Sequence, residues 1–80
     1  MKKIKVQNPH SYDVKISVGD SPSRIPSSTF TVSAGRSVDK SLASGKWLFY
    51  DRVRSNRTMN VMGEVTHDRQ VFVVPQCQEW

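Results

Sequence analysis

The sequence has a single cysteine, Cys77, among its 80 residues. One cysteine excludes a disulfide within the chain, and no second cysteine stands beside it to complete a redox or zinc pair. The two histidines, His10 and His67, lie among polar residues in predicted turns, without the spacing of paired metal ligands. Structural zinc normally needs four ligands. We therefore expect no metal and no cofactor, and we expect both histidines to be exposed turn residues.

Catalytic signatures are also absent. No serine lies in a G-x-S-x-G motif, and the four glycines stand too far apart to form a phosphate-binding loop. Carboxylates such as Asp13 and Asp20 lie near turns, where acids commonly accept backbone hydrogen bonds. The sequence predicts that the protein is not an enzyme.

Long apolar runs are missing as well. No segment approaches the ~20 apolar residues of a membrane-spanning helix. The lysines near the start of the chain are not followed by the apolar core of a signal peptide. These patterns predict a soluble protein without a membrane partner.

No stretch shows a helical stripe, whereas alternation of apolar and polar residues runs through most of the chain. Such alternation is typical of half-buried strands separated by turns. The sequence predicts an all-β fold, a small antiparallel β-sandwich or barrel of about six to seven short strands. The residues expected to face inward include Ile4, Val6, Val14, Ile16, Val18, Phe30 and Val32. In the last strand, Phe72 and Val74 are expected on one face and Val71 and Val73 on the other. A short helix over residues 38–43 is the main local alternative.

The strands around residues 4–6 and 14–18 are predicted to pair as a hairpin or as neighbours. Residues 46–53 are the most apolar segment, so we expect that strand to be covered on both faces. Alternation also places Met59, Val61, Gly63 and Val65 in one row.

Three glycines, Gly19, Gly35 and Gly45, suit turns that need positive φ. Gly63 lies inside a predicted strand, so it predicts a bulge or close packing.

A single domain over residues 1–80 accounts for the whole pattern. It would contain a proline- and serine-rich loop at 21–29 and a short tail at 76–80. A chain of this length buries only roughly 60–65% of its unfolded surface, so its core is thin. Association with a partner, including a second copy of the chain, is therefore a further expectation.

A net charge of +5 favours an acidic partner. The densest basic group is in "LFYDRVRSNR", where Arg52 and Arg54 share a face and Arg57 lies across the predicted turn. If Tyr50 shows on that face, the group could bind a carboxylate-rich protein surface or stack on nucleic acid. An ordinary solvated hairpin tip is the alternative, since charge also protects edge strands. Trp80 could be an apolar partner contact or a lid over the core.

The stretches "IKVQNPHSYDVKISV" and "FTVSAGRSV" resemble the openings of small phage-encoded β-proteins, some of which are virion components such as capsid decoration proteins. The resemblance covers about the first half of the chain. It implies a non-enzymatic structural protein that docks on capsid or tail subunits, located in the virion or the host cytoplasm. The predicted contacts are Arg52, Arg54, Arg57, Tyr50 and Trp80. A nucleic-acid-binding protein, or a small inhibitor of a host nucleic-acid-binding machine, is the alternative.

Overall fold

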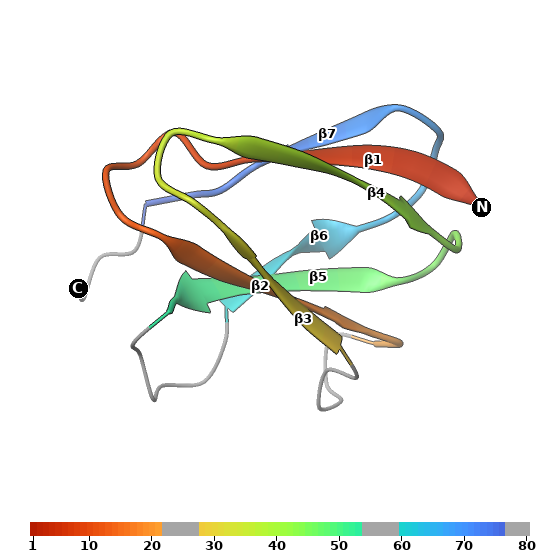
Figure 1. Cartoon of the computed structure of the whole chain (residues 1–80). Coiled ribbons are helices and arrows are strands. Elements are labelled where there is room, and N and C mark those ends of the chain that lie inside the picture. Colours follow the sequence, from red (N-terminus) through yellow and green to blue (C-terminus); the bar gives the residue numbers. More distant parts are fainter. Residues whose placement is uncertain (22–27, 54–59, 77–80) are drawn as a thin grey trace.

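The computed structural model describes residues 1–21, 28–53 and 60–76, which form seven strands in two stacked sheets (Figure 1). In chain order the strands are β1 (Lys2–Gln7), β2 (Val14–Gly19), β3 (Ser28–Val32), β4 (Ser37–Leu42), β5 (Trp47–Arg52), β6 (Asn60–Glu64) and β7 (Gln70–Val73). The predicted all-β class is confirmed, and two separate sheets make the fold a sandwich. The described residues contain no helix long and apolar enough to cross a membrane.

The first sheet has the strand order β4-β1-β7 and the second has the order β3-β2-β5-β6. Within the described residues every pairing is antiparallel except that of β1 with β7, which is parallel. The predicted pairing of β1 with β2 is wrong, because residues 8–13 carry the chain from one sheet to the other. Alternation identified both strands correctly, but it says only that each has one buried face and not which strand lies beside it.

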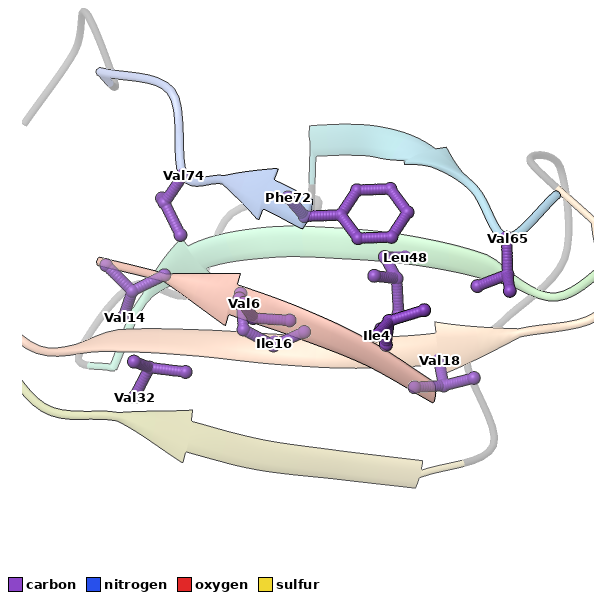
Figure 2. Packing of buried hydrophobic residues seen from close by; sticks show 10 residues of the cluster. All are labelled: Ile4, Val6, Val14, Ile16, Val18, Val32, Leu48, Val65, Phe72 and Val74. Atoms are coloured by element: carbon purple, nitrogen blue, oxygen red, sulfur yellow. The ribbon is translucent and has the colours of Figure 1, made fainter. Parts of the chain in front are cut away.

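The core lies between the two sheets, and its side chains come from both layers (Figure 2). Ile4 and Val6 of β1 are buried, as predicted, and they face Ile16 of β2 and its neighbours. Phe72 and Val74 are also buried, while Val71 and Val73 are exposed. Phe30, predicted to face inward, is half-buried against this core.

β5 is covered on both faces, as its apolar sequence predicted. Leu48 has an exposed fraction of 0% and its neighbour Phe49 one of 4%, although they point to opposite faces. The predicted row along β6 is wrong for Val61 and Gly63, because Gly63 pairs with Leu48 but Val61 pairs with Phe49, and Met59 of that row lies outside the described residues. This register shift is a bulge at Met62 that turns Val61 to the other face.

The two expectations for Gly63 are both confirmed, since it adjoins the bulge and packs closely against the Phe72 ring. Gly35 and Gly45 have φ angles of 71° and 94°, as predicted for turn glycines. Gly19 does not have positive φ, because it extends β2 and pairs with Trp47 instead of ending in a turn.

The structure differs from two predictions of local secondary structure. Residues 38–42 belong to strand β4, so the helical alternative there is wrong. β3 begins at Ser28, two residues inside the range predicted as a proline- and serine-rich loop. Residues 22–27 of that loop and residues 77–80 of the tail lie outside the described residues.

Candidate functional site

Two of the five predicted contact residues, Tyr50 and Arg52, lie in the described part of the chain. Arg54, Arg57 and Trp80 lie outside it, so their predicted roles stay predictions. The site is therefore built from the C-terminal end of β5, where Tyr50 and Arg52 are placed by strand pairing.

Tyr50 and Arg52 share one face of β5, as expected from their spacing. In the ladder with β2, Tyr50 pairs with Ile16 and Arg52 pairs with Val14. Ile16 and Val14 are fully buried, and directly paired residues point to the same face of a sheet. Both side chains therefore project from the inner face of the second sheet, Tyr50 over the core and Arg52 at the end of the strand.

The Arg52 guanidinium lies over the ring of Tyr12, with its central carbon 4.6 Å from the ring centroid. The Tyr12 ring in turn stacks on His10, with centroids 4.9 Å apart and planes inclined by 2°. A guanidinium over an aromatic face is attracted by the negative charge density of the ring. We call Arg52, Tyr12 and His10 together the cation–aromatic stack. It joins the end of β5 to the connection between β1 and β2.

His10 is held by two hydrogen bonds. Its backbone N–H donates to Asn8 Oδ1 over 3.0 Å, and its ring Nε2 lies 2.8 Å from the Val74 carbonyl oxygen. Because a carbonyl only accepts, Nε2 carries the proton in this contact. His10 is thus half-buried rather than an exposed turn residue, whereas His67 is exposed as predicted.

Asn8 fixes the segment that carries the two rings. Its side chain is buried, and its Nδ2 donates to the carbonyl oxygens of Tyr12 at 2.8 Å and Val32 at 3.1 Å. Its backbone N–H donates to the Arg36 carbonyl at 2.8 Å. Buried amide groups are stable only when hydrogen-bonded, so this network holds the β1–β2 connection against the β3–β4 turn. The Asn8 hydrogen bonds therefore fix the backbone that carries Tyr12 and His10.

Asp51 does not face the stack. It precedes Arg52 in β5, pairs with Lys15 and is buried, and alternation directs its side chain to the opposite face of the sheet. The Arg52 backbone N–H donates to Asp51 Oδ1 over 2.8 Å. The Asp51 carboxylate therefore accepts a backbone hydrogen bond at the end of β5. The Arg52 side chain extends from the other face of the strand to the Tyr12 ring.

The cation–aromatic stack carries groups that can recognise an anion. The residues in ranges 1–21, 28–53 and 60–76 contain no group of three His, Cys, Asp or Glu side chains that could hold a metal ion. His10 uses Nε2 on a backbone carbonyl, and the other two members of the stack are an aromatic ring and a guanidinium. A guanidinium recognises carboxylate or phosphate groups through its planar set of N–H donors.

The sequence analysis missed Tyr12 and His10 as members of the site. The signal was available in "NPHSY", where two rings two residues apart precede an apolar strand. Their distance from Arg52 in sequence, 40 residues for Tyr12, hid the contact, because only the pairing of β2 with β5 brings these segments together.

No model of a known protein family matches the chain, and neither the curated proteins nor the solved structures include a significant match.

Proposed function

We propose that this protein acts by binding, and that it docks on an acidic surface of another protein through the end of the sandwich that carries the cation–aromatic stack. The observation that carries the proposal is the position of Arg52, held over the Tyr12 ring at 4.6 Å. Its partners in this role would be Tyr50 and the remaining predicted contacts Arg54, Arg57 and Trp80.

A restrained arginine favours binding for an entropic reason. Ordering a long side chain at an interface costs about 0.5–1.5 kcal/mol, and a side chain that is already ordered avoids part of that loss. Arginine and tyrosine are also enriched among the residues that dominate interface energies. The half-buried Tyr12 and Arg52 combine both properties at one end of the molecule.

For the identity of the partner, we propose capsid or tail subunits of a phage particle, on which the chain would act as a decoration or accessory protein. The support is the resemblance of "IKVQNPHSYDVKISV" and "FTVSAGRSV" to small phage β-proteins, together with the net charge of +5. A basic protein is attracted to an acidic shell before it makes specific contacts.

Incorporation into particles tests this proposal. The tagged wild type, Arg52→Ala and Arg52→Lys would be expressed during infection, and the amount of each in purified particles measured. We expect Arg52→Ala to lower incorporation about tenfold, and Arg52→Lys to restore only part of it, because lysine lacks the planar donor set. Lys5→Ala is the matched control, since Lys5 is exposed on the other sheet and its loss removes the same charge. Absence of the wild type from particles would refute the phage assignment, and equal incorporation of folded Arg52→Ala would refute the docking role.

Nucleic-acid binding, or inhibition of a nucleic-acid-binding machine, is the second candidate. It is favoured by the guanidinium on an aromatic ring in a basic chain, a combination used to hold single strands. Filter binding with single-stranded and duplex probes over a salt series distinguishes it. If the protein contacts phosphates, its affinity should fall as salt is added. The logarithm of the binding constant should decrease with the logarithm of the salt concentration, with a slope of about −0.7 per phosphate contact for single strands. A lack of salt-dependent retention would remove this candidate.

A further inference from the structure

Among the described strands each sheet has two edges, and three of these four edges carry features that oppose pairing with another chain. β4 has Asp39 and Lys40 in its middle, and β6 contains the bulge and ends in Glu64. β3 is uncharged, but the Lys40 ammonium lies over the ring of its Phe30 at 4.6 Å. Charges and bulges at edges are the usual means by which β-proteins avoid edge-to-edge association.

β7 is the exception. It has one neighbour among the described strands, β1, and it lies at the rim of the upper layer in Figure 1. Residues 70–76 contain no charged side chain, and the register with β1 runs without a shift. Val71 and Val73 each expose 53% of their surface on the outer face of the sheet. This is an uncharged, regular edge strand with exposed apolar side chains, the type that pairs with another strand.

We propose that β7 pairs antiparallel with β7 of a second copy of this chain, across a two-fold axis, so that the two three-stranded sheets become one continuous sheet. The exposed valines Val71 and Val73 are not members of the cation–aromatic stack, although the Val74 carbonyl beside them accepts a hydrogen bond from His10. The proposal does not depend on the proposed function. The core is left intact, because Phe72 and Val74 already point inward.

The alternation of side chains selects one register. Directly opposed residues in an antiparallel pair share a face, so Val71 must face an odd-numbered residue of the second copy. With the axis at Phe72, each Val71 faces the second copy's Val73. A shift of the axis to residue 71 would place Val73 opposite Arg69, and a shift to residue 73 would place Val71 opposite Pro75. The register centred on Phe72 alone matches apolar residues on both strands.

The register favours a second copy as the occupant, because the strand matches its own apolar residues, and the net charge of +5 does not prevent this pairing. Two basic side chains lie near this edge: Arg69, directly before β7, and Lys5, in the adjacent strand β1. In the pair each Arg69 faces the second copy's Pro75, so the two Arg69 residues are six residues apart along the strands, about 20 Å. In the pair, the two Lys5 residues are separated by three interstrand spacings, about 14 Å in total. This exceeds the Debye length of roughly 8 Å at physiological salt, so their repulsion is largely screened. A strand of four residues buries little area, and we therefore expect a weak dimer with a dissociation constant on the order of 10–100 µM.

Sedimentation velocity of the full chain over a concentration series from about 1 to about 500 µM tests the proposal, since this range brackets the expected constant. We expect the wild type to shift from monomer to dimer, and Val71→Lys and Val73→Lys each to raise the dissociation constant tenfold or more. Val61→Lys is the matched control, because Val61 is an exposed valine on β6, an edge strand of the second sheet, with 47% of its surface exposed. It should dimerise like the wild type. A monomeric wild type at the highest concentration, or equal dimerisation of folded Val71→Lys, would overturn the proposal.

Disulfide trapping tests the register. In a Cys77→Ser background, chains carrying Val71→Cys are mixed with chains carrying Val73→Cys. The mixture should form a heterodimeric disulfide, because opposed residues have Cα atoms about 4.5–5.5 Å apart. Val71→Cys alone should crosslink at least fivefold more slowly, because its equivalent in the second copy lies two residues along the strand. Preferential crosslinking of Val71→Cys with itself would overturn the register.

Discussion

The ring of Phe72 lies where a side chain on Gly63 would begin: a Cβ placed on Gly63 would be 3.0 Å from Phe72 Cε1. Gly63 belongs to the second sheet and Phe72 to the first, so this contact closes one side of the sandwich. The bulge at Met62 and the missing side chain together let the two layers approach.

Gly63→Ala should therefore destabilise the protein by about 1–3 kcal/mol, the usual cost of adding volume to a packed site. The Phe72 ring is buried, so it cannot move away without disturbing the core. Urea unfolding measures the effect. In a Phe72→Leu background the same substitution should cost less, and an equal cost in both backgrounds would show that the ring is not the obstacle.

Asn8→Ala should lower the free energy of unfolding by about 2–4 kcal/mol, because it leaves the Tyr12 and Val32 carbonyls without their buried donor. Asn8→Asp should be more destabilising at neutral pH, since the introduced carboxylate would face carbonyl oxygens. Its pKa would be raised, and stability would then recover as the pH falls and the carboxyl becomes neutral. Denaturation at several pH values checks both variants. A pH-independent loss in Asn8→Asp would contradict this account of the network.

The contact between Arg52 and Tyr12 can be measured by a double-mutant cycle with Arg52→Ala and Tyr12→Leu. We expect a coupling energy of about 0.5–1 kcal/mol, as for a partly exposed cation–aromatic pair. Tyr12→Phe should retain most of it, because the ring face is unchanged. Additive effects of the two substitutions would show that the contact does not restrain the guanidinium.

Asp68 should make stability depend on acid pH. The hydrogen bond from the Lys3 amide, 2.7 Å long, lowers the pKa of the Asp68 carboxyl below its usual value near 3.8, and the charge of Arg69 adds to this lowering. The unfolded chain then binds more protons than the folded one at acid pH, so the free energy of unfolding falls as the pH drops through this range.

Asp68→Asn keeps an oxygen acceptor for Lys3 but has no titratable group. We expect this variant to lose part of the decline in thermal stability seen below about pH 4 in the wild type. Asp39→Asn is the control, since Asp39 is an exposed acid on strand β4. An unchanged pH profile in Asp68→Asn would exclude a contribution from this hydrogen bond.

The sequence predicted where the strands lie better than it predicted which strands pair with each other. Alternation of single residues located Ile4, Ile16 and Val32 in the core, because the period of a strand is a local property. The choice of partner strand is not local, and the error over β1 and β2 followed from this. The error over Val61 has a similar origin, because one inserted residue in β6 reverses the face of those before it.

The candidate site was predicted in part for the same reason. The shared face of Tyr50 and Arg52 follows from their spacing, and the ladder with β2 confirms it. The stacking of the two sheets makes this face the inner one and brings Arg52 to Tyr12. Neither result follows from spacing along the sequence. His10 appeared exposed in sequence because its neighbours are polar, whereas its partner is a backbone carbonyl that sequence patterns do not reveal.

The parallel ladder between β1 and β7 sets an order of events during biosynthesis. Ile4 pairs with Gln70, so strand β1 gains its second neighbour, β7, only after residues 70–73 have left the ribosome. The second sheet contains β2, β3, β5 and β6, all of which precede β7 in the chain, so its ladders can form earlier. Contacts between such distant segments slow folding. A released chain that ends near residue 66 would therefore retain every strand of the second sheet while the first lacked β7.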